Sequence, residues 1–189
     1  MKPAFIFLAS ILLCKSATGR TQEISQDPVA GFFQPAAEEE PGLKNPYSVG
    51  SKAPDISLES ISEDTMVLSK VKSSLLLLSF WKTECGPCQD EYKSTLIPLY
   101  QKYFHQGFQI FAVSFDTNRK KWRRAIVRNE YTWIQVADFN GIKRSKTAQQ
   151  YKIVSLPANY LLDENGIVLA KNLQGNQLKS FVEQYLEEK

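Results

Sequence analysis

The sequence predicts an α/β protein with a central mixed β-sheet and helices on both faces of that sheet. Between residues 75 and 151, apolar runs typical of strands alternate with segments of helical periodicity, which favours parallel strands joined by helices. Nearer the C-terminus, Asp163-Glu164-Asn165-Gly166 separates two apolar runs. Asn-Gly in that position is typical of a β-hairpin, so the sheet should also contain antiparallel strands.

The clearest strand signal lies at residues 75–81, Leu-Leu-Leu-Leu-Ser-Phe-Trp, where the nearly unbroken apolar run suits a central strand buried on both faces. The first two strands are expected at residues 55–58 and 66–68, joined by a polar turn at residues 62–64. Further strands are expected at residues 108–115, 133–136, 159–162 and 167–171.

Helices are expected at about residues 87–105, 118–129, 145–151 and 176–187. Pro87 suits the first turn of a helix, where its missing N–H costs nothing, whereas Pro98 should kink the same helix. Gly107 should end that helix. Asn118 and Asn176 are expected to cap the second and the last helix.

Length and charge indicate one ordinary soluble domain. The chain has 189 residues and a formal net charge of +3, and its basic residues are dispersed. The densest basic run, Arg119-Lys120-Lys121 followed by Arg123-Arg124, is typical of a solvated helix face. We therefore expect no nucleic-acid partner.

Residues 1–19 are predicted to be a secretory signal peptide. Lys2 supplies positive charge, residues 4–13 are apolar but too short to span a bilayer, and Ala17-Thr18-Gly19 offers a cleavage site. Cys14 raises the alternative of a lipoprotein signal. Such a signal has a small residue just before the cysteine, and Leu13 is not small. The protein is therefore expected to be exported to the periplasm or cell envelope, with membrane contact only through an N-terminal anchor.

Residues 20–48 are rich in Gln, Glu, Pro and Ala and predict a flexible linker. The alternative is an ordered extension packed on the domain through Phe32 and Phe33. From residue 49 to residue 189 the pattern is that of a globular domain.

The chemistry of the chain is concentrated in Cys85-Gly86-Pro87-Cys88, which joins a buried strand to a helix. The helix N-terminus should lower the pKa of the Cys85 thiol, and the thiolate is the species that attacks disulfides. Cys88 is close enough to resolve the resulting mixed disulfide. Gly86 and Pro87 shape a tight turn that leaves the first sulfur accessible. Cys85 and Cys88 are therefore predicted to form a redox-active disulfide.

Two other roles for this pair are less consistent with the sequence. A structural zinc site needs four ligands, and beyond the pair the exported chain offers only one histidine, His105. A purely structural disulfide that closes so short a loop would stabilise the fold little. We therefore expect neither a metal nor another cofactor.

Several segments together resemble the TlpA-like disulfide reductases of the bacterial envelope, a branch of the thioredoxin superfamily related to the AhpC/TSA peroxiredoxin-like group. Phe80–Cys88 is similar to the active-site segment of thioredoxin-like proteins, and Val49–Asp55 to the opening of this family. Phe108–Asp116 and Leu156–Asp163 are similar to two of its strands. The resemblance covers about residues 49 to 189 and implies a thioredoxin-like fold.

The resemblance implies that Pro157 is cis and packs beside the cysteine pair. The backbone of Leu156 could then pair with an incoming chain as an added strand. Trp81, Gly86 and Pro87 would complete the surface that binds a partner. The implied partners are disulfide-containing or dithiol proteins of the envelope, together with a membrane electron donor.

The chain departs from plain thioredoxins at three positions. Glu84 replaces the Trp before the first cysteine, where a carboxylate would raise the pKa of the nucleophile and repel acidic partners unless it is solvated. Ser79 replaces a buried Asp that accepts a proton. Glu91, three residues after Cys88, matches the Glu of the cytochrome-maturation reductases. Two interpretations of Glu91 are open: it is either an acid/base that tunes Cys88 or a solvated carboxylate favoured by the helix dipole.

The function that follows is a thiol–disulfide oxidoreductase that reduces partner disulfides in the envelope. A peroxiredoxin-like thiol peroxidase is the first alternative, but Thr83 lies at the wrong spacing for a Pro-x-x-x-Thr-x-x-Cys frame and no Pro precedes it there. A non-enzymatic binding module with the same fold is the second. The sequence leaves the direction of electron flow open.

Overall fold

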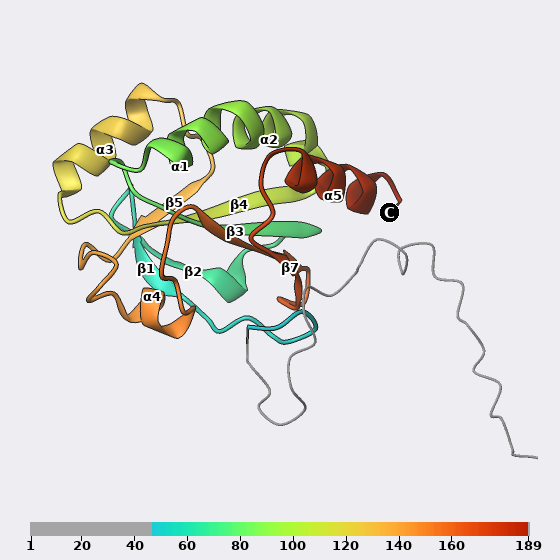
Figure 1. Cartoon of the computed structure of the whole chain (residues 1–189), viewed down its shortest axis with the longest axis horizontal. Coiled ribbons are helices and arrows are strands. Elements are labelled where there is room, and N and C mark those ends of the chain that lie inside the picture. The colour runs from blue at the N-terminus through green and yellow to red at the C-terminus, as the bar shows by residue number, and fades with distance from the viewer. Residues whose placement is uncertain (1–46, 189) are drawn as a thin grey trace, which may run out of the picture. The chain divides into compact units, whose positions relative to one another are not determined.

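The computed structural model describes residues 47–188 (Figure 1). The predicted signal peptide, Cys14 and nearly all of the predicted linker lie outside the described residues. Within residues 47–188, no helix is both long enough and apolar enough to cross a bilayer.

A mixed seven-stranded sheet forms the centre of the domain, in the order β2-β1-β5-β4-β3-β6-β7. β3 and β5 lie parallel to β4, whereas β6 is antiparallel to both β3 and β7, and β1 is antiparallel to both β2 and β5. The predicted α/β class and mixed sheet are confirmed. The strands are β1 (Ser57–Ser60), β2 (Thr65–Val67), β3 (Leu75–Trp81), β4 (Phe108–Ser114), β5 (Ile134–Ala137), β6 (Ala158–Asp163) and β7 (Val168–Lys171).

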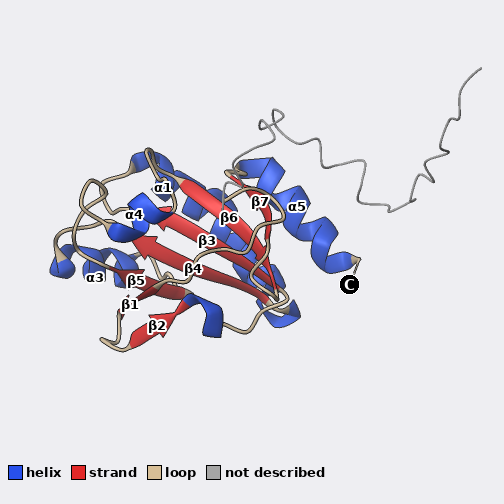
Figure 2. Ribbon diagram, turned by 90° about the horizontal axis from the view of Figure 1, so that it is seen from below, coloured by secondary structure: helices blue, strands red, loops and turns tan. Residues whose placement is uncertain are grey.

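Helices cover both faces of this sheet (Figures 1 and 2). One face packs against α1, α2, α3 and α5, and the opposite face against α4 and η1. The helices are α1 (Gly86–Glu91), α2 (Ile97–Tyr103), α3 (Arg119–Arg128), α4 (Lys146–Gln150) and α5 (Gly175–Glu187), and the shorter turns are η1 (Leu68–Lys70), η2 (Tyr92–Leu96) and η3 (Phe104–Gln106).

β3 is the strand on which the site is built, and every one of its residues is buried. Its side chains alternate between the two layers, because successive residues of a strand point to opposite faces. Leu75, Leu77 and Trp81 pack in the same cluster as Cys88. The intervening apolar residues pack in the other cluster, beside α4. The run of residues 75–81 is thus a central strand, as predicted.

The helix expected at 87–105 is divided in two by a π-helical turn. The N–H of Ile97 donates to the carbonyl of Tyr92, five residues earlier, so the wider turn η2 ends two residues before Pro98. Proline cannot donate and crowds the preceding turn, which explains why the irregularity occurs there. Gly107 ends the segment with a φ of 89°, in the left-handed conformation that glycine adopts readily.

Some boundaries differ from those predicted. β1 begins at Ser57 instead of residue 55, because the Asp55 carboxylate accepts hydrogen bonds from the N–H groups of Ile56 and Ser69 and holds the chain out of the ladder. Asn176 does not cap the last helix: α5 begins one residue earlier, at Gly175, and its first N–H is bound by Glu91. Asn118 does cap α3, as expected, by accepting from the N–H of Lys121.

Candidate active site

Cys85 and Cys88 lie where β3 passes into α1, and they are joined by a disulfide with Cα atoms 5.2 Å apart. Cys85 is the N-cap residue of α1, and its Sγ accepts a hydrogen bond of 3.2 Å from the N–H of Cys88. Cys85 is partly exposed, whereas Cys88 is fully buried. An incoming disulfide can therefore reach Cys85 but not Cys88.

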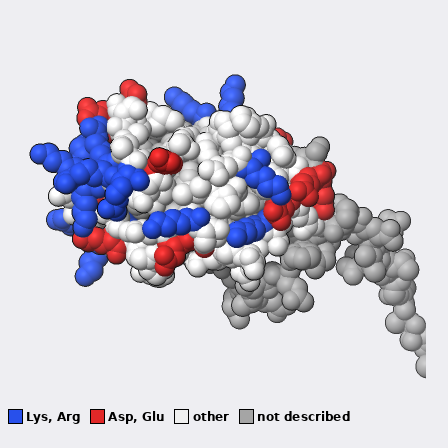
Figure 3. Space-filling view, turned by 90° about the horizontal axis from the view of Figure 1, so that it is seen from above, with Lys and Arg blue, Asp and Glu red and all other residues white. Residues whose placement is uncertain are grey.

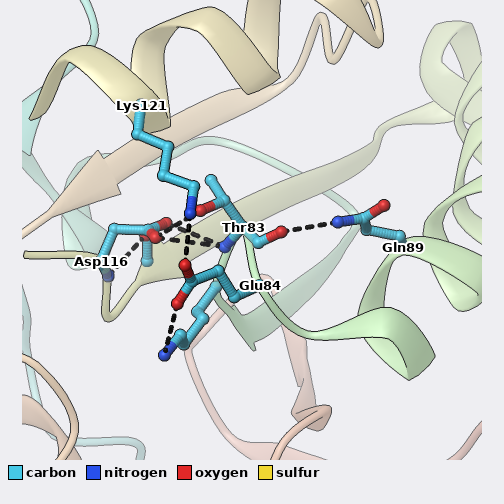
Figure 4. A network of polar contacts seen from close by, with 7 residues as sticks. Thr83, Glu84, Gln89, Asp116 and Lys121 are labelled. Carbon is cyan, nitrogen blue, oxygen red and sulfur yellow. Dashed lines mark hydrogen bonds and ion pairs between the residues drawn. The ribbon is translucent and has the colours of Figure 1, made fainter. Parts of the chain in front are cut away.

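The loop before Cys85 is held by the buried carboxylate of Asp116, which follows β4 (Figure 4). Asp116 Oδ2 accepts from the N–H of Thr83 at 3.0 Å and from the Ser114 hydroxyl at 2.7 Å, and Oδ1 accepts from the Thr83 hydroxyl at 2.6 Å. On the other side, the Gln89 side chain donates to the Thr83 carbonyl at 2.6 Å. These bonds fix the loop to both β4 and α1.

Sequence reasoning did not identify Asp116 as part of the site. The feature of the sequence that could have identified it is its position after a strand that runs parallel to β3. Parallel neighbouring strands end at the same edge of the sheet, so the residues that follow them lie close together.

Glu84, beside the nucleophile, is paired with two lysines. Its carboxylate forms an ion pair with Lys121 of α3 and a second with Lys82, at 3.4 Å (Figure 4). The hydrogen bond and charge of Lys121, followed by those of Lys82, lower the pKa of Glu84. Glu84 is thus an anion whose charge is offset locally, so the repulsion expected from an unpaired carboxylate is reduced.

A cavity of about 270 Å³ lies next to these residues. Its lining comes from the loop before Cys85, the segment between β4 and α3, and the chain after β5. The lining residues are Lys82, Glu84, Phe115, Asp116, Thr117, Asn118, Lys121, Gly141 and Ile142.

Hydroxyl groups occupy the layer that contains Cys88. Ser79 is buried, and its Oγ lies 3.2 Å from the Oη of Tyr92. Burial raises the pKa of Tyr92 well above its ordinary value, so the phenol stays neutral. Where a thioredoxin would hold a buried carboxylate, this chain holds a neutral hydroxyl pair.

Glu91 is partly buried and bound to another element. Its Oε1 and Oε2 accept from the N–H of Gly175 at 3.0 and 3.2 Å. Glu91 therefore binds the first N–H of α5, a role that neither of the sequence-based alternatives included.

Trp81 lies in the core instead of on the predicted binding surface. It is 1% exposed, and its ring packs against those of Tyr92 and Tyr131, with centroids 5.3 and 5.6 Å away. The alternation of β3 explains this correction, since Trp81 shares the face of Leu75 and Leu77 beneath the helices.

The remaining predicted binding residues are accessible. Gly86 and Pro87 are exposed, and Leu156 and Pro157 are partly exposed. The Leu156–Pro157 peptide bond is cis, as the resemblance implied. Leu156 and Cys85 both pack against the apolar cluster that contains Cys88.

Comparisons with known proteins show which family the chain resembles. Residues 49–171 match the AhpC/TSA family. The chain is 32% identical over 146 residues to the thiol-disulfide oxidoreductase ResA of Geobacillus thermodenitrificans, covering 76% of this chain and 79% of that protein. It is 28% identical over 159 residues to the thioredoxin-like protein YneN of Bacillus subtilis, covering 82% and 86%. The thioredoxin domain of a thiol-disulfide oxidoreductase from Bacteroides vulgatus superposes with a TM-score of 0.68 at 30% identity, covering 74% of this chain and 98% of that one.

Proposed function

The chain belongs to the AhpC/TSA family, as a TlpA-like thiol–disulfide oxidoreductase of the thioredoxin superfamily, and from that premise we propose that it reduces the disulfides of partner proteins in the bacterial cell envelope. The observation that carries the proposal is the asymmetry of the pair: Cys85 is accessible at the N-terminus of α1, and Cys88 is buried behind it.

The reaction is two successive thiol–disulfide exchanges. In the reduced enzyme, the N–H groups of α1 favour the thiolate of Cys85. This thiolate attacks one sulfur of the partner disulfide, forms a mixed disulfide and releases the other sulfur as a thiolate. Cys88 then attacks Cys85 Sγ and expels the second partner thiolate. Two electrons pass to the partner, and the enzyme is left with the Cys85–Cys88 disulfide.

For Cys88 to attack, its thiol must first lose a proton. We assign Glu91 as the acceptor, because it lies three residues further along the helical segment and carries a carboxylate. The hydrogen bond from Gly175 does not prevent this role, since a carboxylate can accept several hydrogen bonds. Glu91 would then both hold α5 and take the proton of Cys88.

The partner-binding surface consists of Gly86, Pro87, Leu156 and Pro157. All four are at least partly exposed, and an extended partner segment can pair with the backbone of Leu156. Trp81 supports this surface from the core without touching the partner.

The domain organisation and the location in the envelope rest on the sequence. A signal peptide over residues 1–19, with a lipoprotein signal at Cys14 as its variant, would export a domain spanning residues 49–189 on the linker of residues 20–48. In that compartment a membrane electron donor would re-reduce the pair.

The peroxidase alternative receives no support from the site. The only threonine beside the first cysteine, Thr83, donates its hydroxyl to Asp116 and is therefore engaged in holding the loop.

The decisive experiment follows insulin reduction with dithiothreitol as the electron source. We expect the wild-type chain to accelerate it, Cys85→Ser to abolish the acceleration, and Cys88→Ser to accumulate a mixed disulfide through Cys85. Activity that survives Cys85→Ser would overturn the proposal. The reduction potential of the Cys85–Cys88 couple tests the direction of electron flow. A value near the roughly −270 mV of thioredoxin supports a reductase, and one near about −120 mV indicates an oxidant.

A further inference from the structure

The charges beside Cys85 are arranged around a single exposed carboxylate. Glu84, the residue directly before the nucleophile, is paired with Lys121 and Lys82, and all three line the cavity of about 270 Å³. The Glu84 side chain is 60% exposed, so these ion pairs are exchangeable contacts at the surface and not buried ones.

The other carboxylate of the cavity is already satisfied. Asp116 is 5% exposed, and both of its oxygens accept hydrogen bonds from Thr83 or Ser114. Asp116 is therefore bound by neutral donors, and neither Lys82 nor Lys121 forms an ion pair with it among the described residues. Once Glu84 turns away, an anion entering the cavity meets the ammonium groups of Lys82 and Lys121.

Helix α3 adds to this positive field. The helix reads Arg-Lys-Lys-Trp-Arg-Arg-Ala-Ile-Val-Arg, and its first turn carries no acidic residue. Thr117 and Asn118, which precede it, line the cavity, so the positive end of the helix dipole lies at the cavity. Figure 3 shows Lys and Arg side chains gathered at the end of the molecule where α3 lies.

We propose that the partner protein carries an acidic side chain beside its reducible disulfide, and that this carboxylate displaces Glu84 from Lys121 and Lys82 when the partner docks. This inference rests on the proposed reductase function and specifies its substrate class. Glu84 occupies the lysines in the free enzyme. Its displacement favours an acidic partner, because the two positive charges of Lys82 and Lys121 outnumber the one negative charge of Glu84 and repel a basic side chain. A partner side chain fits better than a lipid surface, because the lysines line a cavity next to the nucleophile.

The test measures kcat/KM of the full chain for disulfide-linked peptides that differ only in the residue next to one cysteine, which is Asp, Asn or Lys. For the wild type we expect the Asp peptide to exceed the Lys peptide by about two- to fivefold, as for exposed charge pairs. Lys121→Gln should reduce the ratio to about one, because the single remaining ammonium group, Lys82, is then balanced by Glu84 and no excess positive charge is left for the partner's carboxylate. Glu84→Gln should raise the ratio further, because no competing carboxylate remains.

Lys120→Gln is the matched control. Lys120 is an exposed lysine of the same helix that is not among the residues lining the cavity, so its loss should leave the peptide ratio unchanged. A Lys121→Gln ratio equal to that of the wild type would overturn the inference.

Two further outcomes separate the inference from its premise. Equal reduction of all three peptides by the wild type, abolished in Cys85→Ser, would overturn the acidic preference while leaving the reductase function intact. No reduction of any peptide would overturn the function itself. If Lys121→Gln weakened binding to phosphatidylglycerol vesicles without changing the peptide ratio, the charge would serve a lipid surface and the inference would be wrong.

Discussion

At the scale of single residues, the environment of Cys85 is set by charges that lie outside the Cys-Gly-Pro-Cys motif. Glu84 is adjacent in sequence, but the lysine that holds it most closely, Lys121, lies 37 residues further along the chain. The negative charge of Glu84 next to the Cys85 thiolate is therefore offset by the positive charges of Lys82 and Lys121. Replacing any one of these side chains should shift the titration of the nucleophile in a direction that follows from its charge.

Glu84→Gln should lower the pKa of the Cys85 thiol in the reduced enzyme. The substitution removes a negative charge and leaves Lys82 and Lys121 to stabilise the thiolate. The pH dependence of Cys85 alkylation by iodoacetamide measures this shift, and the reduction potential should rise with it. Glu63→Gln is the control, because Glu63 pairs with Arg123 of α3, the helix that carries Lys121. It should leave the pH dependence of alkylation unchanged. A higher pKa in Glu84→Gln would contradict this account of the charges.

Glu91→Gln should slow the resolving step by about tenfold or more, since it removes the proposed proton acceptor of Cys88. Glutamine keeps an oxygen that can accept from the Gly175 N–H, so α5 stays in place and the effect reports on proton transfer. Stopped-flow decay of the mixed disulfide between pH 5 and 9 measures the rate. In the control Asp90→Asn, which changes an exposed neighbouring carboxylate, the decay should be unaltered. If the mixed disulfide of Glu91→Gln decayed at the wild-type rate, the only role of Glu91 would be to hold α5.

The sequence identifies the residues of the site that act locally. The cysteine pair and the exposed Gly86 and Pro87 follow from one short motif, and the cis proline at 157 follows from the resemblance to the family. The contact between Glu91 and Gly175 spans 84 residues, and no local pattern records it. The burial of Trp81 could have been anticipated, because it continues the alternation of a strand already recognised.

At the scale of elements, the site depends on how β4 supports the loop between β3 and α1. The strand and helix that flank the cysteines were predictable from apolar runs and from Pro87 at the start of the helix. The support from Asp116 was not, since it depends on the register that places the ends of β3 and β4 together. The π-helical turn η2 was anticipated only as a kink, because Pro98 signals an interruption without specifying its form.

Asp116→Ala should lower the free energy of unfolding by about 3 kcal/mol and reduce turnover, because it leaves buried donors of Thr83 and Ser114 without an acceptor. Urea unfolding of the oxidised protein measures the first effect, and insulin reduction the second. Asp55→Ala is a matched control. Asp55 also accepts several hydrogen bonds, from Ile56 and from both the N–H and the hydroxyl of Ser69, but it is exposed.

Asp55 is exposed and Asp116 is only 5% exposed, so water replaces the lost acceptor more readily at position 55. Asp55→Ala should therefore cost about 1 kcal/mol or less and leave turnover unchanged. Equal losses of stability in the two variants would show that the burial of Asp116 does not set its contribution.

At the scale of the whole molecule, the layers follow from the sequence but the order of the strands does not. Apolar runs and helical periods predict a mixed sheet between two helical layers, and the structure confirms it. The same patterns do not reveal that β1 lies between β2 and β5, because an alternating strand can pair on either side of several neighbours. That placement is set by pairing between segments far apart in the chain, in which Glu59 and Ser60 lie opposite Ala137 and Val136.

Both layers of the core bury tyrosines, and this gives the whole domain a dependence on alkaline pH. Burial raises the pKa of each of these phenols above the ordinary value of 10, so the folded state keeps them protonated. They are Tyr92, Tyr100, Tyr131, Tyr151 and Tyr160. In the unfolded chain the same groups lose their protons above about pH 10.

The free energy of unfolding should therefore be constant with respect to these groups below about pH 10 and fall above it, by up to about 1.4 kcal/mol per pH unit for each tyrosine still protonated in the fold. The sign follows because the folded state binds more protons than the unfolded state in that range. Urea unfolding at intervals from pH 8 to 11.5 measures the slope, and tyrosinate absorbance should rise together with unfolding. In Tyr151→Phe the free energy of unfolding should fall less steeply with pH, by the contribution of one tyrosine. Stability that stays level up to pH 11.5 would show that these phenols ionise without opening the core.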